Sequence, residues 1–113
     1  MDIKLDLSKE GLEMCFRQYE RIMLYKLWKD ATPTGSGRLW EHCMKVIGPK
    51  ENGRPAISRA SVIFAANRLV DNGIWSFEDA TGKGGHHRRY FSAMTQAEFW
   101  SQVQDICKKK LAF

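Results

Sequence analysis

Residues 58–92 constrain the fold of this chain most, because they predict one helix that leads directly into one β-hairpin. Ser58 is a favourable helix N-cap, and Asn72 and Gly73 are residue types that end helices. Apolar side chains recur between them at helical spacing: Val62, Ala65, Ala66, Leu69 and Val70. Two aromatic-rich runs of strand length follow at 74–78 and 87–92, and the glycine-rich, partly basic segment 79–86 is predicted to join them as a loop.

The length and composition are those of one ordinary globular domain. The chain has 113 residues, of which 43% are hydrophobic and 27% charged, so we expect a single domain over residues 1–113. No apolar run is long enough to span a bilayer, and the N-terminus alternates charged and apolar residues, so we expect neither a signal peptide nor a membrane anchor. The three cysteines are odd in number and widely spaced, which favours reduced thiols and a cytoplasmic protein over a disulfide framework.

The net charge of +5 arises mainly in the middle of the chain. Residues 31–94 carry nine Lys and Arg against five Asp and Glu, whereas residues 1–30 carry six of each. Because the excess coincides with the predicted helix and hairpin, we take a polyanionic partner such as nucleic acid as the hypothesis to test.

A long first helix is predicted from Ser8, which can cap it, to about Leu27. Its side chains form a continuous apolar stripe: Leu12, Cys15, Phe16, Tyr19, Ile22, Met23 and Leu27. The segment before it, residues 3–7, alternates apolar and charged side chains and fits either a short strand or an ordered arm.

A second helix is expected between two breaks in the pattern. Residues 32–35 contain a proline and a glycine, Ser36 can cap the helix, and Gly48 with Pro49 ends it. The inward-facing residues of this helix are Leu39, Trp40, Cys43, Met44 and Ile47. Residues 48–57, with two prolines and two glycines, form a loop before the next helix.

A last helix follows the hairpin. Thr95 and Glu98 match a capping box, and the apolar positions of the helix are Phe99, Trp100, Val103, Ile106, Cys107 and Leu111. A helix this short is not stable alone, so we expect it to pack against the N-terminal part of the first helix, in the same chain or in a second copy of it. The candidate dimer interface comprises Leu12, Phe16, Tyr19, Phe99, Trp100, Val103 and Ile106.

Three stretches carry a resemblance to a known family: residues 19–29 (YERIMLYKLWK), residues 62–75 with NRLVDNGI at 67–74, and residues 89–92 (RYFS). In this order they resemble the first-helix signature, the recognition helix with the start of the wing, and the returning wing strand of the penicillinase repressor and methicillin-resistance regulator family. The resemblance covers about residues 18–93 and implies a dimeric winged-helix repressor of a palindromic operator. One helix of under twenty residues stands here in place of the family's multi-helix C-terminal dimerisation region, so its sensor-protease switch and its control of antibiotic resistance are not carried over.

The expected fold is therefore mainly α with a small antiparallel β-hairpin, an α+β winged helix-turn-helix with an extended N-terminal helix and a C-terminal helix. The core covers about residues 18–93, and residues 8–17 and 95–113 form the dimerisation helices. The expected function is sequence-specific binding of double-stranded DNA by a transcriptional regulator, acting as a dimeric repressor. The alternatives are a winged-helix protein-interaction module of a larger complex, and a nonspecific architectural or replication-associated DNA binder.

The candidate DNA-binding residues lie on the second helix, the loop after it, the recognition helix and the wing. They are Arg38, Arg54, Ser58, Arg59, Ser61, Phe64, Asn67, Lys83, His87, Arg88 and Arg89. Strand alternation places Arg88 and Arg89 on opposite faces, so we expect one of them to meet DNA and favour Arg88.

Two positions on the recognition helix have open alternatives. Asn67 can pair bidentately with adenine or can be an ordinary surface residue. Phe64 and Ile63 either contact thymine methyl groups or pack under the second helix and the loop, and we expect packing for at least one of them.

The sequence does not indicate an enzyme, a metal site or a cofactor. The histidines and cysteines lack the spacing of metal ligands, and the glycine-rich run at 82–85 lacks the spacing and the following Ser or Thr of a P-loop. Nucleophile and general-base pairs are likewise not evident in the sequence.

Overall fold

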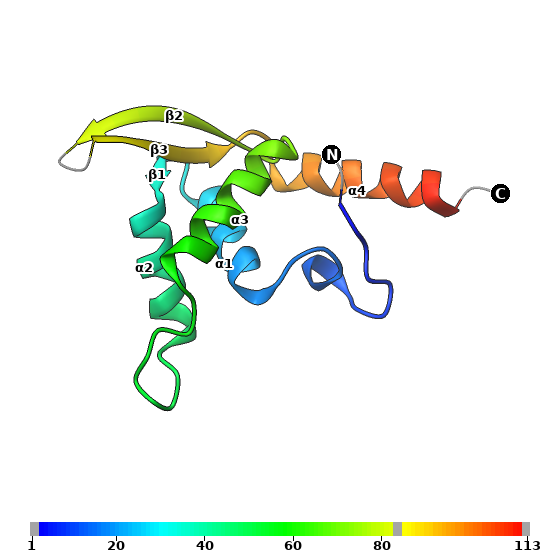
Figure 1. Cartoon of the computed structure of the whole chain (residues 1–113). Coiled ribbons are helices and arrows are strands. Elements are labelled where there is room, and N and C mark those ends of the chain that lie inside the picture. The colour runs from blue at the N-terminus through cyan, green and yellow to red at the C-terminus, as the bar shows by residue number, and fades with distance from the viewer. Residues whose placement is uncertain (1–2, 83–84, 112–113) are drawn as a thin grey trace.

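The structure of the chain, a computed structural model, describes residues 3–82 and 85–111 (Figure 1). In chain order its elements are the 3₁₀ helix η1 (Gly11–Met14), α1 (Gln18–Lys29), β1 (Thr34–Gly35), α2 (Ser36–Ile47), α3 (Arg59–Asp71), β2 (Trp75–Gly82), β3 (Gly85–Ser92) and α4 (Gln96–Leu111). The described residues thus form four α-helices and a three-stranded antiparallel sheet with strand order β1-β3-β2. The α+β fold and the hairpin that follows α3 are confirmed, and the topology is consistent with a winged helix-turn-helix.

Helix α3 forms where the sequence predicts it. The hydroxyl of Ser58, the N-cap, accepts the N–H of Ser61 at 3.1 Å. Gly73 ends the helix with a φ of 76°, a conformation that glycine adopts at little cost. Of the five apolar residues that recur at helical spacing, Val70 is half-buried and the other four are buried in the core: Val62, Ala65, Ala66 and Leu69.

The hairpin is longer than the sequence predicts. Strands β2 and β3 pair from Trp75–Ser92 to Gly82–Gly85, so the prediction of a loop over residues 79–86 is wrong for its described part. Opposite charges face each other across the ladder, Asp79 against Arg88, and such pairs favour continued pairing. Strand β1, which the sequence does not predict, pairs with the other edge of β3 (Figure 1).

The prediction of one long N-terminal helix from Ser8 is wrong. Helix α1 begins at Gln18, and Arg17 before it has an extended conformation (φ −70°, ψ 164°). The buried carboxylate of Glu20 accepts the backbone N–H of Arg17 at 3.0 Å, which caps α1 at this point. Residues 3–7 form an arm rather than a strand, and Ile3 at its start is buried in the core.

Helix α4 docks within its own chain. The Thr95–Glu98 capping box is present, and Phe99 is buried against Phe16 and Trp28, with ring centroids 5.9 and 5.5 Å apart. Figure 1 shows α4 leading away from the sheet, so its far end projects from the body. No helix in the described part of the chain is long and apolar enough to cross a membrane.

This docking divides the predicted dimer-interface residues into two groups. Leu12, Phe99 and Val103 are already buried within one chain, which leaves them no surface for a partner. The remaining members are half-buried and keep part of their surface: Phe16, Tyr19, Trp100 and Ile106. Residues 8–17 contain only the short 3₁₀ helix η1 and no α-helix, so the prediction of a helix over this whole segment is wrong.

Helix α2 ends as predicted at Gly48, but Gly35 is its N-cap and Ser36 is its first helical residue. Because β1 runs directly into α2, the start of the helix lies beside β3, next to the wing. This junction positions the site described below.

Candidate nucleic-acid interface

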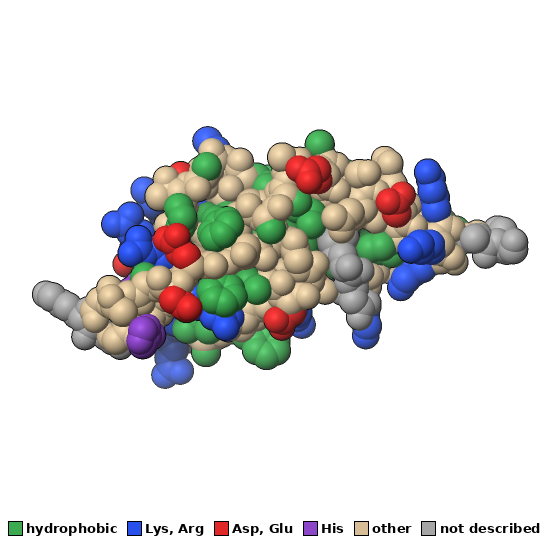
Figure 2. All heavy atoms as spheres, turned by 90° about the horizontal axis from the view of Figure 1, so that it is seen from above, with side chains coloured by type: hydrophobic (Ala, Val, Ile, Leu, Met, Phe, Trp, Pro, Cys, Tyr) green, Lys and Arg blue, Asp and Glu red, His purple; other side chains and the backbone are tan. Residues whose placement is uncertain are grey.

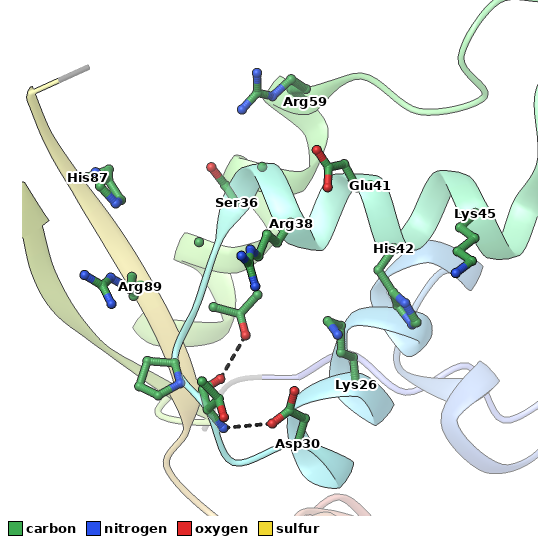
Figure 3. Close-up of a pocket in the computed structure, with 15 residues that line it drawn as sticks. Lys26, Asp30, Ser36, Arg38, Glu41, His42, Lys45, Arg59, His87 and Arg89 are labelled. Atoms are coloured by element: carbon green, nitrogen blue, oxygen red, sulfur yellow. Dashed lines mark hydrogen bonds between the residues drawn. The ribbon is translucent and has the colours of Figure 1, made fainter. Parts of the chain in front are cut away.

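A basic hollow of about 1140 Å³ lies where the starts of α2 and α3 meet β1, β3 and the end of α1 (Figure 3). Five of its lining residues are Lys or Arg and two are acidic; the charged residues are Lys26, Asp30, Arg38, Glu41, Lys45, Arg59 and Arg89. His42 and His87 also line it. The positive excess, together with the positive end of the α2 dipole, favours an anionic partner.

Four of the predicted DNA-binding residues meet around this basic hollow although they come from three separate elements. Arg38 belongs to α2, Arg59 to α3, and His87 and Arg89 to β3 (Figure 3). None of the ion pairs in the described part of the chain involves these arginines. Unpaired guanidinium groups in a partly enclosed site are suited to phosphate oxygens.

Arg59 joins the start of α3 to the start of α2. Its Nη2 lies so close to Gly37 that a β-carbon at that glycine would be 2.9 Å away. The guanidinium also lies 6.0 Å above the ring of Trp40, whose Nε1 donates to the carbonyl of Ile57 at 2.8 Å. The two helix starts are thus tied together, and Gly37 leaves the room that the arginine occupies.

The outward face of α3 is apolar at its centre. Phe64 is 70% exposed and Ile63 is 40% exposed, so the expectation that at least one of them packs under α2 and the loop is wrong. The guanidinium of Arg68 lies 5.7 Å from the Phe64 ring and also pairs with the buried Glu20. Arg68 therefore holds the side chain of Phe64 against α3 while the ring stays open to solvent.

Asn67 is engaged by the wing. Its Oδ1 accepts a hydrogen bond from the Tyr90 hydroxyl at 2.7 Å and another from Arg88 Nη1 at 3.1 Å. Because a guanidinium can only donate, the atom that it contacts must be the amide oxygen. Both lone pairs of that oxygen are used, so the bidentate adenine pairing predicted from sequence, in which this oxygen accepts from the base, is not available in this arrangement.

Arg88 and Arg89 lie on opposite faces of β3, as strand alternation predicts, but their surroundings differ. The guanidinium of Arg88 lies 3.9 Å from the Phe77 ring centroid and is held against Asn67. Among the described residues the Arg89 side chain makes no hydrogen bond, ion pair or ring contact, and it lines the basic hollow. The open position is that of Arg89 rather than that of Arg88, which the sequence favoured.

The other predicted residues lie outside this cluster. Ser58 and Ser61 bond to each other through their hydroxyls at 2.9 Å, which commits both to the cap of α3. Arg54 is exposed in the loop 48–57 and does not line the basic hollow. Lys83 lies outside the described residues.

Sequence reasoning missed Lys26, Lys45 and Tyr90. Lys26 is half-buried on α1 and Lys45 is exposed on α2, and only the packing of the two helices places them beside the arginines. Burial, and the charges of Lys26 and Lys45, lower the pKa of His42, so this histidine is neutral at pH 7. Burial raises the pKa of Tyr90, which keeps its hydroxyl protonated and donating to Asn67.

The described residues contain no group of three or more His, Cys, Asp or Glu that could hold a metal ion. Their arrangement offers instead an unpaired cationic cluster, an exposed aromatic ring on α3 and a wing fixed to that helix by hydrogen bonds. No protein-family model matches the chain, and no curated protein sequence matches it.

Proposed function

We propose that this protein is a sequence-specific, double-stranded DNA-binding transcriptional regulator that acts as a dimeric repressor in the cytoplasm. The observation that carries the proposal is the convergence of Arg38, Arg59 and Arg89, without ion-pair partners among the described residues, at the junction of α2, α3 and the wing. The resemblance of residues 18–93 to the penicillinase repressor family supports the same function.

In this proposal the two parts of the site have different tasks. The arginines around the basic hollow neutralise backbone phosphates, which supplies affinity for any duplex. Helix α3 enters the major groove with Phe64 outward, where an apolar ring can contact thymine methyl groups. The β2–β3 wing lies over the flanking backbone, fixed relative to α3 by Asn67.

Dimerisation relies on the side chains that one chain leaves partly exposed. The best surface is the projecting half of α4, where Ile106 is half-buried and Leu111 is exposed. A twofold axis there would present two α3 helices to successive major grooves. Light scattering is expected to give twice the chain mass of 13.0 kDa at micromolar concentration, and a monomer mass would contradict the dimer.

Selection of bound sequences from a random duplex pool tests the function directly. We expect enrichment of an inverted repeat whose half-sites are about one helical turn, roughly 10 base pairs, apart. Binding without enrichment would favour a nonspecific architectural role. Absence of binding at low salt would refute the proposal.

A second candidate is a protein-interaction module of a larger complex, which is favoured by the exposure of Phe64 beside Ile63. Phe64→Ser separates the two functions. In the DNA-binding function it lowers affinity for the selected sequence more than for unrelated duplexes, whereas in the interaction module it leaves DNA affinity unchanged.

A further inference from the structure

A second hollow, which we name the α1–α2 groove, lies between the last turns of α1 and the middle of α2. It has a volume of about 610 Å³ and is lined by Ile22, Tyr25, Lys26, Lys29, Asp30, His42 and Val46. Small-molecule sites in proteins have volumes of about 300–1,000 Å³, so the α1–α2 groove has the size of such a site.

The walls of the α1–α2 groove include two apolar side chains that are exposed. Tyr25 from α1 is 49% exposed and Val46 from α2 is 56% exposed, and both border the same hollow. Trp28 contacts the Tyr25 ring edge-on, with centroids 5.9 Å apart, and limits where that ring can move. Two large apolar side chains exposed on facing helices form a surface that a flat apolar ligand would cover.

Positive charge borders these apolar walls. Lys26 and Lys29 lie one turn apart on α1, and neither belongs to an ion pair in the part of the chain that the structure describes. The opposing charge is that of Asp30, whose carboxylate accepts the backbone N–H of Thr32 at 3.1 Å. That bond, the side-chain hydrogen bond of Thr32 and the charge of Lys26 lower the pKa of Asp30, so its carboxylate offsets one of the two lysine charges.

His42 adds no charge at pH 7, because burial and, to a smaller extent, the charges of Lys26 and Lys45 lower its pKa. The α1–α2 groove therefore combines apolar walls with one net positive charge at its edge. We propose that it is a binding site for small aromatic carboxylates, with the aromatic ring between Tyr25 and Val46 and the carboxylate on the ammonium group of Lys26.

The α1–α2 groove adjoins the basic hollow, since Lys26, Asp30 and His42 line both (Figure 3). A carboxylate on Lys26 would reduce the positive charge beside the phosphate-binding arginines. If the proposed function holds, the ligand weakens DNA binding by roughly twofold at low salt, and the reciprocal effect has the same size. Binding of the carboxylate itself does not depend on the proposed function.

The test is an NMR titration of the full ¹⁵N-labelled chain with 2-naphthoate, with the neutral 2-naphthamide as the matched ligand. We expect saturable shifts confined to amides near residues 22–30 and 42–46, with a Kd of about 1 mM for a ligand of this size. Naphthamide is expected to bind about fivefold more weakly. Lys26→Met, which keeps the apolar stem, is expected to remove that preference, whereas Lys109→Met on α4 should leave it unchanged.

Three outcomes would overturn the proposal: equal affinity for acid and amide, shifts centred on another surface such as that around Phe64, or no saturable shift up to the solubility limit. Circular dichroism of both variants verifies that they are folded. Because the readout needs no DNA, a chain that binds naphthoate but no duplex would refute the proposed function and leave this site intact.

Discussion

Replacing Tyr90 by Phe removes one hydrogen bond between the wing and α3. The Tyr90 hydroxyl donates to Asn67 Oδ1 at 2.7 Å, and its ring is buried against Trp75 with centroids 5.8 Å apart. Phenylalanine keeps the ring, and Asn67 Oδ1 keeps its second donor, Arg88, so no acceptor is orphaned. The cost is therefore that of one ordinary hydrogen bond, about 1 kcal/mol of unfolding free energy, or about 4 °C in Tm.

Tyr25→Phe is the matched control. It deletes the same atom from a tyrosine that is half exposed and whose hydroxyl makes no hydrogen bond within the described residues, so its effect should stay within about 0.5 kcal/mol. Urea denaturation of the three proteins, followed by circular dichroism, gives both differences. Equal stability of the two variants would refute the claim that Asn67 holds the wing against α3.

Tyr90→Phe has a second expected effect, on DNA recognition. It frees one lone pair on Asn67 Oδ1 and should therefore raise the preference for adenine in selected duplexes.

Three further predictions concern separate contacts. Gly37→Ala should raise or preserve Tm, because alanine favours a helix by about 1 kcal/mol over glycine. It should also lower DNA affinity, because the new β-carbon displaces the guanidinium of Arg59. A fall in Tm would show that this guanidinium cannot move aside. Arg68→Ala leaves the buried Glu20 without its cation and should cost about 1–2 kcal/mol in urea denaturation, discounted because the arginine is half exposed, whereas Arg68→Lys should recover part of the loss. Burial raises the pKa of Cys15 and Cys43 to about 11 from 9.0, so between these values the folded chain retains protons that the unfolded chain releases. The stability that these two protonated thiols contribute should be constant below pH 9 and be lost between pH 9 and 11, and a Cys43→Ala variant that keeps the full decline in that range would contradict this origin.

The sequence predicts best the elements whose signals are local. Helix α3 has a cap, an inward apolar stripe and a terminating glycine within sixteen residues, and all of them act in the structure as predicted. The break before α1 was missed, because its cap is a buried carboxylate, Glu20, that depends on a partner 48 residues away. The apolar side chains of residues 12–16 are covered as predicted, but they pack against α4 without forming part of a continuous helix.

The sequence predicted several individual residues of the site, but it did not predict how they are arranged in space. Arg38, Arg59 and Arg89 are recognisable as cations near a helix start or in a wing, but only the β1–β3 pairing brings them to one hollow. The roles of Asn67 and Arg88 could not be predicted from sequence, because each depends on a hydrogen bond across 21 residues. Hydrogen bonds between side chains of different helices and strands leave no pattern in the local sequence.

The central claim, that the arginines of the basic hollow contact backbone phosphates, is tested by the salt dependence of DNA binding. The measurement is fluorescence anisotropy of one labelled duplex over a salt series, for the unchanged chain and for the Arg38→Gln, Arg59→Gln, Arg89→Gln triple variant. The matched control replaces Lys108, Lys109 and Lys110 by Gln, which removes the same charge from the last turn of α4, where Figure 2 shows basic side chains gathered. We expect the slope of log K against log salt to fall by about 2 to 3 for the arginine variant and to change little for the lysine variant. Equal slopes for the two variants, or no salt-dependent binding by the unchanged chain, would contradict the account.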